Sequence, residues 1–82
     1  MSKSRKTAPF SPEYRSFCRL LREAREEAGI TQVALAKRLR KYQSYVAKYE
    51  SGERRLDVIE FIRIMKALSK NPAQLIQQLH ML

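Results

Sequence analysis

The chain has 82 residues, and its seventeen Lys and Arg against eight Asp and Glu give a formal net charge of +9, which favours polyanionic partners. With 44% hydrophobic residues it is expected to form one small folded domain rather than a disordered chain, and its apolar runs are too short to predict a membrane span or a signal peptide. The single cysteine, Cys18, excludes an intrachain disulfide framework and a multi-cysteine zinc site.

The chain divides into a basic start and one domain. Residues 1–10 are predicted to be a flexible basic arm, and 11–82 the folded domain. Lys3, Arg5 and Lys6 of the arm could follow DNA phosphates or reach a minor groove. An unstructured solubilising tail is an equally good interpretation.

The first helix is predicted from about Ser11 to Gly29. Serine is a good N-cap, Pro12 suits the first helical position, and glycine commonly ends helices. Cys18 falls inside this helix and is interpreted as a small buried hydrophobe. Apolar residues at spacings of three and four predict one buried stripe: Tyr14, Phe17, Leu21, Ala24 and Ala28.

Two short amphipathic helices, joined by a break of about three residues, are predicted between Thr31 and Glu50. Thr31 caps the first; the second runs from about Gln43 to Ser51 and ends at Gly52. Two helices packed across a tight turn, with a polar and cationic outer surface, match the helix-turn-helix geometry. Their predicted buried residues are Leu35, Ala36 and Leu39 in the first helix, and Val46 and Tyr49 in the second.

Two further helices complete the predicted domain. Asp57 with Glu60 three residues later resembles a capping box, and a helix is expected to follow to about Ser69. Asn71 and Pro72 then suit the cap and first position of a last helix. Predicted core residues are Val58, Phe61, Ile62, Met65 and Leu68, and then Leu75, Ile76 and Leu79. The predicted fold class is all-α, with five short helices.

The ordered set of residues around this motif resembles a known family. The chain contains, in order, Arg25, Gly29, Ile30, Thr31, Gln32, Leu35, Ala36, Leu39, Gln43, Ser44, Val46 and Glu50, and then Ser51-Gly52-Glu53-Arg54-Arg55. This pattern resembles the Cro/repressor-type helix-turn-helix, or XRE, family of bacterial and phage transcriptional regulators. The resemblance covers about residues 17–79. It implies a compact five-helix, lambda-repressor-like DNA-binding domain with its helix-turn-helix at the second and third helices.

The turn between the two motif helices departs from the family pattern. Arg40 stands where the family often has glycine, so either Arg40 adopts a left-handed backbone at some cost or the turn differs from that of the family. Lys41 replaces an apolar residue, and Tyr42 replaces a capping Ser, Thr or Asp. These changes add positive charge beside the expected DNA surface. Residues 36–55 contain seven basic and two acidic residues, so this segment carries +5 of the +9.

The resemblance implies base-reading roles on the third helix. Gln43, at its start, is expected to pair with an adenine, because an amide offers one donor and one acceptor. Ser44, Tyr45 and Lys48 continue the outward face and are further candidates for base contacts. Lys48 could instead meet a phosphate, and Tyr45 could simply pack against the domain. An exposed glutamine without a specific role remains the alternative for both Gln43 and Gln32.

The resemblance also implies phosphate contacts and a structural ion pair. Gln32 is expected to bind a phosphate and to support Gln43, and Arg25 and Glu50 are expected to pair and fix the third helix. Further residues expected to bind phosphates are Arg22, Lys41, Tyr42, Arg54 and Arg55.

Nothing in the residue pattern suggests catalysis. His80 is the only histidine and has no evident partner in the sequence, and the chain has only two glycines and no glycine-rich phosphate loop. No cluster of residues has the spacing of a metal site. We therefore expect a protein that is not an enzyme and has no cofactor or metal.

The predicted function is that of a transcriptional regulator that binds double-stranded DNA at a specific sequence. We expect a repressor, cytoplasmic and of bacterial or phage origin. A homodimer is expected to read a pseudo-palindrome through the third helix. The candidate dimer-interface residues are Ile59, Leu79, Met81 and Leu82. One alternative is an antitoxin that holds a small protein partner and binds its own operator. Another is a protein that binds RNA or membranes without specificity, through charge alone.

Overall fold

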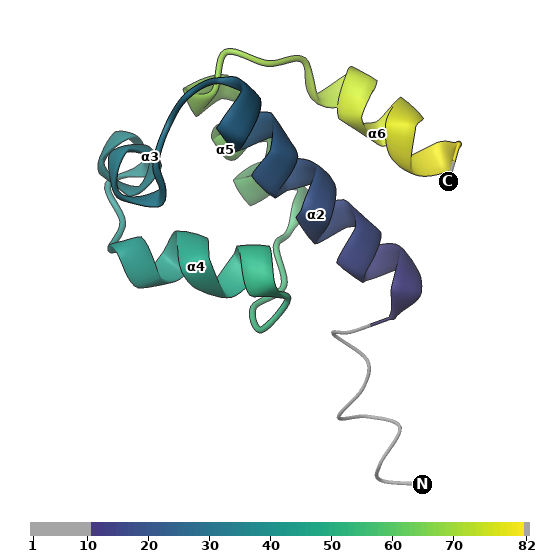
Figure 1. Cartoon of the computed structure of the whole chain (residues 1–82), viewed down its shortest axis with the longest axis horizontal. Helices are drawn as coiled ribbons and strands as arrows, with labels where there is room; N and C mark the ends of the chain where they lie inside the picture. Colours follow the sequence, from purple (N-terminus) through teal and green to yellow (C-terminus); the bar gives the residue numbers. More distant parts are fainter. Residues whose placement is uncertain (1–10, 82) are drawn as a thin grey trace, which may run out of the picture.

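The computed structural model describes residues 11–81, which contain helices and no strand. The helices are α2 (Pro12–Glu27), α3 (Gln32–Leu39), α4 (Gln43–Ser51), α5 (Val58–Ala67) and α6 (Pro72–His80). Figure 1 shows α2 running through the middle of the domain, with α3 and α4 on one side and α6 on the other. The predicted all-α fold and its five helices are confirmed. The predicted basic arm and Leu82 lie outside the described residues.

Side chains at the helix starts explain why the helices begin where they do. Ser11, Thr31, Asp57 and Asn71 each accept a hydrogen bond from a backbone N–H of the first turn, as the sequence predicts. Asp57 forms a complete capping box with Glu60. Tyr42, which precedes α4, makes no such bond. The start of α4 therefore depends on its packing rather than on a local cap.

Four helices are followed, within two residues, by a residue in the left-handed conformation. Gly29 and Gly52 have φ of 72° and 87°, while Arg40 and Ser69 have φ of 59° and 56°. At Arg40 the turn is closed by a bond of 2.9 Å from the Lys41 N–H to the Ala36 carbonyl. Of the two alternatives that the sequence leaves open, the structure has the left-handed backbone, so Arg40 bears the conformational cost that glycine avoids.

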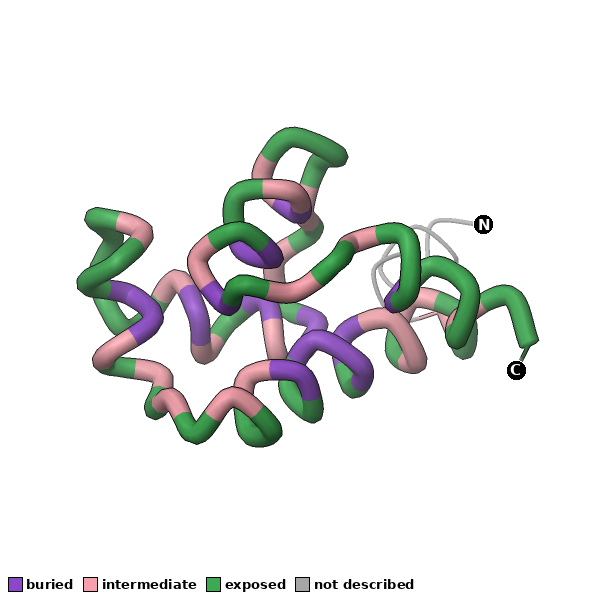
Figure 2. Tube along the Cα trace, turned by 90° about the horizontal axis from the view of Figure 1, so that it is seen from above, coloured by how far each residue is buried: buried purple, intermediate pink, exposed green. Residues whose placement is uncertain are grey.

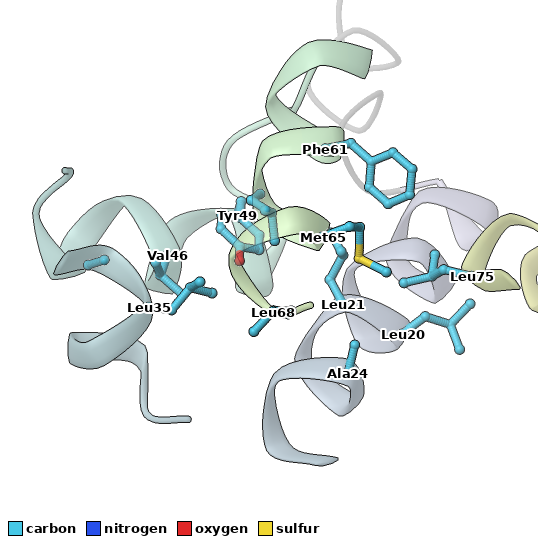
Figure 3. Close-up of a cluster of buried hydrophobic side chains, with 12 residues drawn as sticks. Leu20, Leu21, Ala24, Leu35, Val46, Tyr49, Phe61, Met65, Leu68 and Leu75 are labelled. Atoms are coloured by element: carbon cyan, nitrogen blue, oxygen red, sulfur yellow. The ribbon is translucent and has the colours of Figure 1, made fainter. Parts of the chain in front are cut away.

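The hydrophobic core contains buried side chains from all five helices. Figure 2 shows the buried segments turned toward one another, and Figure 3 shows Leu21, Tyr49 and Met65 at the centre of the cluster. The side chains of Leu21, Leu35, Val46, Tyr49 and Ile64 are fully buried. Tyr14, Phe17 and Ala28 are only half-buried, so the buried stripe of α2 is centred on Cys18, Leu20, Leu21 and Ala24.

Two of the predicted core residues are exposed. Val58 is 69% exposed and Ile76 is 47% exposed, so the prediction that they face the core is wrong. Val58 is the first residue of α5, and the buried residues of this helix begin only at Phe61, about one turn later. On α6 the buried residue is Leu75. Ile76 is the next residue along the helix, so its side chain points about 100° away from that of Leu75. None of the helices within residues 11–81 is long and apolar enough to span a membrane.

Candidate nucleic-acid interface

A buried ion pair holds the third helix of the domain against the first. The Arg25 guanidinium donates to the Glu50 carboxylate through Nε at 2.7 Å and through Nη2 at 3.1 Å. Its Nη1 donates to the Ile30 carbonyl at 2.9 Å. The side chains of Arg25 and Glu50 are only 11% and 3% exposed. The pairing expected from the sequence is therefore present in the structure, and it fixes the end of α4 to α2.

The hydrogen bonds continue from this pair to the exposed start of α4. Gln32 Nε2 donates to Glu50 Oε1 at 3.0 Å, and Gln43 Nε2 donates to Gln32 Oε1 at 3.2 Å. We call Arg25, Glu50, Gln32 and Gln43 the relay. Because Glu50 accepts from the Gln32 amide nitrogen, the Gln32 oxygen is turned toward Gln43. Gln43 keeps its own oxygen and one N–H for another partner.

A cationic hollow of about 630 Å³ lies beside the exposed side of α4. Its lining includes three of the predicted base-reading residues and brings them together with three predicted phosphate-binding ones. The lining residues are Arg40, Lys41, Tyr42, Ser44, Tyr45, Lys48 and Arg54. Four of these seven are cationic and none is acidic, so the hollow suits a negatively charged ligand.

Tyr45 forms the wall of the cationic hollow. Its ring packs edge-on against the buried ring of Tyr49, with 5.6 Å between the centroids. Lys41 Nζ lies 5.2 Å and the Arg54 guanidinium 4.8 Å from the Tyr45 ring centre, within the range of cation–π attraction. Tyr45 is half-buried, and this burial raises the pKa of its hydroxyl. Of the two roles that the sequence leaves open for Tyr45, the geometry favours packing.

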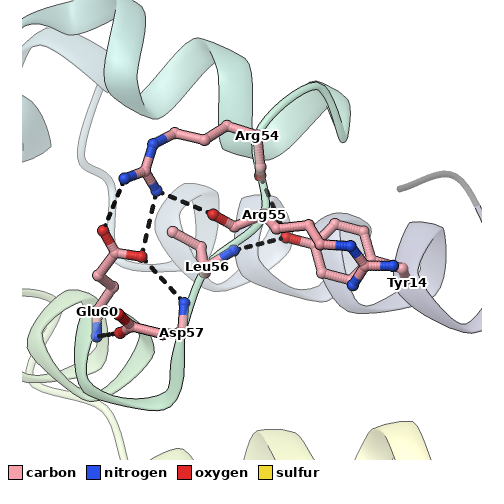
Figure 4. Close-up of polar contacts among 6 residues, drawn as sticks. All are labelled: Tyr14, Arg54, Arg55, Leu56, Asp57 and Glu60. Atoms are coloured by element: carbon pink, nitrogen blue, oxygen red, sulfur yellow. Dashed lines mark hydrogen bonds and ion pairs between the residues drawn. The ribbon is translucent and has the colours of Figure 1, made fainter. Parts of the chain in front are cut away.

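Arg54 is held by a glutamate of the same chain (Figure 4). Its Nη1 and Nη2 donate to the two carboxylate oxygens of Glu60 at 3.2 Å and 2.9 Å, and Nη1 also donates to the Arg55 carbonyl at 2.9 Å. Glu60 accepts in addition the Asp57 N–H of its capping box, at 3.0 Å. The Arg54 guanidinium first, and then the Asp57 amide, lower the pKa of Glu60.

The loop between α4 and α5 is fastened to α2 by one hydroxyl. Tyr14 Oη donates to the Arg54 carbonyl at 3.2 Å and accepts the Leu56 N–H at 3.0 Å. The Arg55 guanidinium lies 4.6 Å from the centre of the Tyr14 ring. Arg54 and Arg55 therefore point in opposite directions, toward Glu60 and toward Tyr14 (Figure 4).

The remaining predicted site residues lie elsewhere. Arg22 is exposed on α2, outside both the relay and the cationic hollow. Among the candidate interface residues, Ile59 is 56% and Met81 83% exposed, whereas Leu79 is half-buried. Leu79 lines an open hollow of about 330 Å³ that also includes Tyr14.

Three residues of this surface were missed as site residues by the sequence analysis. Glu60 was recognised as part of a cap, but not as the partner of Arg54. Tyr14 was assigned to the core stripe, although its hydroxyl bonds to a loop about forty residues away. Arg40 was noted for its backbone and not as a wall of the cationic hollow. Two signals were present in the sequence: the capping-box spacing of Glu60 and the positive charge that Arg40 adds to the turn.

Comparison with known proteins agrees with this geometry. The helix-turn-helix family model matches residues 21–75. An XRE-family like protein from Pseudomonas syringae pv. tomato is 43% identical, with a TM-score of 0.79, over 96% of this chain and 92% of that one. This chain belongs to the XRE family of helix-turn-helix proteins. It is thus a DNA-binding transcriptional regulator, as its resemblance predicts.

Two regulators are also similar in structure. The restriction-modification controller protein C.AhdI from Aeromonas hydrophila is 32% identical, with a TM-score of 0.67, over 72% of this chain and 86% of that one. The clp gene regulator ClgR from C. glutamicum is 22% identical, with a TM-score of 0.78, over 89% and 94%, and shares the fold. No curated protein matches the chain.

Proposed function

We propose that this XRE-family protein is a repressor that binds a pseudo-palindromic operator as a homodimer and reads its bases through α4. The relay is the observation that supports this most directly. It links the buried Arg25–Glu50 pair to the exposed amide of Gln43 through bonds of 3.0 Å and 3.2 Å. A side chain oriented before binding loses less conformational entropy when it meets a base.

The free atoms of the Gln43 amide match one base in particular. Its Oε1 can accept from adenine N6 while its remaining N–H donates to N7, the pairing that suits an amide in the major groove. Ser44 and Lys48 are exposed on the same helix and extend this reading surface. Lys48 suits either a guanine edge or a phosphate, because its ammonium only donates hydrogen bonds.

The cationic hollow supports contact with the DNA backbone next to this reading surface. Lys41 and Tyr42 are exposed at the turn before α4, where their ammonium and hydroxyl groups can meet a phosphate. Arg40 extends the same charged surface. Such contacts add affinity without reading sequence. Arg22 and Arg55 remain candidates for phosphate contacts at the edges of the interface.

Exposed apolar side chains support the homodimer. Val58 and Ile59 are 69% and 56% exposed at the start of α5, and Met81 is 83% exposed after α6. Leu79 lines an open hollow with Tyr14 and Arg55, so the end of α6 adjoins the loop that leads into α5. A second copy would cover these side chains and place two recognition helices about one DNA turn, ~34 Å, apart.

Selection of bound duplexes from a random pool tests sequence-specific reading. The native protein should enrich a pseudo-palindrome. On its best duplex, Gln43→Ala should lose about 1–3 kcal/mol of binding free energy and the preference at one base pair of each half-site. An equal loss on specific and random duplexes would contradict base reading by Gln43. Enrichment of no duplex would favour binding through charge alone.

Light scattering at micromolar concentration tests the homodimer. The mass should be roughly twice the chain mass of 9.6 kDa, and Ile59→Glu should halve it. Val33→Glu is the matched control, because Val33 is also exposed but lies on α3. A strict monomer that binds one asymmetric site would contradict the homodimer, and a stable complex with a small second protein would favour the antitoxin alternative.

A further inference from the structure

Glu60 occupies the part of Arg54 that a phosphate would use. The Nη1 and Nη2 edge of the guanidinium faces both carboxylate oxygens, at 3.2 Å and 2.9 Å. Arginine recognises phosphate and carboxylate by the same planar, two-bond geometry. A phosphate that meets Arg54 must therefore displace Glu60 from this edge or bind at another edge, close to the negative charge of Glu60.

The Arg54–Glu60 pair lies beside the proposed DNA-binding surface, so a DNA phosphate and Glu60 can compete for the Arg54 guanidinium. Arg54 lines the cationic hollow together with Ser44 and Lys48, two exposed residues of α4. Glu60 lines a small neighbouring hollow of about 70 Å³ with Lys41 and Tyr45, which also line the cationic hollow. The side chains of Arg54 and Glu60 are 40% and 20% exposed, so solvent and a bound polyanion can both reach the pair.

We infer that Glu60 is an internal substitute for a DNA phosphate, which neutralises Arg54 in the free protein and thereby lowers the affinity of the protein for any duplex. The inference rests on the proposed DNA-binding role of α4 and adds to it a residue that restrains sequence-independent binding. Arg54 contributes its charge to the complex only when the carboxylate releases it. Affinity then depends more on the base contacts made by Gln43 and its neighbours.

A charge-neutral variant that keeps the capping box tests this role. Glu60→Gln preserves an acceptor for the Asp57 N–H, because glutamine also completes a capping box. Glu53→Gln is the matched control, since Glu53 is exposed in the loop next to Arg54 and forms no ion pair within residues 11–81. Both variants remove one negative charge, but only Glu60→Gln releases Arg54.

Affinity for the selected duplex and for a random duplex is measured at several salt concentrations. Glu60→Gln should bind both duplexes about two- to fivefold more tightly than Glu53→Gln, the range expected for an exposed ion pair. For Glu60→Gln the slope of log affinity against log salt should also be steeper by about 0.9, because one further phosphate is neutralised in the complex. In an Arg54→Gln background most of the difference between the two variants should disappear.

Equal affinities and slopes for Glu60→Gln and Glu53→Gln would overturn the inference. Weaker binding of Glu60→Gln, with a native melting temperature, would also overturn it, because Glu60 would then be holding Arg54 in its DNA-binding position. Failure of the proposed function gives a different result, in which the native protein selects no duplex. A native protein that selects a duplex, with no difference between the variants, contradicts only the role of Glu60.

Discussion

Two arginine–glutamate pairs flank the recognition helix, and they differ in burial and in further bonds. Arg25–Glu50 is 11% and 3% exposed, and its carboxylate also accepts from Gln32. Arg54–Glu60 is 40% and 20% exposed and lies at the rim of the cationic hollow. The same chemistry therefore serves two purposes. The buried pair positions the helix, whereas the exposed pair controls how much charge the surface offers to DNA.

The largest expected effect is on the buried pair. Glu50→Gln should lower the free energy of unfolding by about 3 kcal/mol, because it leaves the buried charge of Arg25 without its counter-charge. Glu60→Gln should cost at most about 1 kcal/mol, because water screens that pair. Urea denaturation followed by circular dichroism measures both. Similar losses of stability for the two variants would show that burial does not determine how much each pair contributes to stability.

The sequence predicts the buried pair but not the exposed one. Arg25 and Glu50 occupy positions that the family pattern assigns to an ion pair, so the resemblance alone indicates them. The helix caps Ser11 and Thr31 were predictable because capping depends on neighbours within three residues. The pairing of Arg54 with Glu60 depends on the path of the loop between α4 and α5, for which the sequence has no local rule.

The face of a short helix was predictable only in part. Phe61 and Met65 of α5 are buried as expected, but Val58 fits the same spacing and is exposed. The spacing of apolar residues identifies a stripe along the helix. Whether the residues at the ends of that stripe are buried depends on which other helices pack over them. The Tyr14 hydroxyl bonds are likewise made across about forty residues, beyond any local pattern.

The second prediction concerns Tyr14, whose hydroxyl bonds to the backbone of the loop that carries Arg54. Tyr14→Phe should lower stability by about 1–2 kcal/mol, because it removes two hydrogen bonds and leaves the Leu56 N–H without its acceptor. Tyr49→Phe is the matched control, since the Tyr49 hydroxyl is buried without a hydrogen-bond partner within the described residues. It should be neutral or stabilising. Thermal melts in which both variants lose the same stability would refute the anchoring role of Tyr14.

The third prediction concerns Arg40, whose side chain adds charge to the cationic hollow while its left-handed backbone destabilises the fold. Arg40→Gly and Ser69→Gly should each raise the free energy of unfolding by about 0.5–1 kcal/mol, because both relieve a left-handed residue. Only Arg40→Gly should weaken DNA binding, since only Arg40 lines the hollow. Equal DNA affinity of the two variants would remove Arg40 from the interface.

The smallest expected effect is a pH dependence that belongs to the exposed pair. Arg54 lowers the pKa of Glu60 in the folded protein. The pair therefore stabilises the fold fully at a pH above the pKa of an unfolded-state glutamate, about 4.3. This contribution is lost as the pH falls through the lower pKa of the folded state. The melting temperature of the native protein should therefore fall slightly more than that of Glu60→Gln between pH 5 and pH 3. Parallel curves would mean that the pair does not contribute to stability.

The central claim is that the relay orients Gln43 for base reading, and a double-mutant cycle on DNA binding tests it most directly. Gln32→Ala, Gln43→Ala and the double variant are titrated with the selected duplex and with duplexes changed at one base pair. The account predicts that both single variants lose preference at the same base pair, and that the double variant loses little more than Gln43→Ala. Losses that add, or preferences lost at different base pairs, would contradict it.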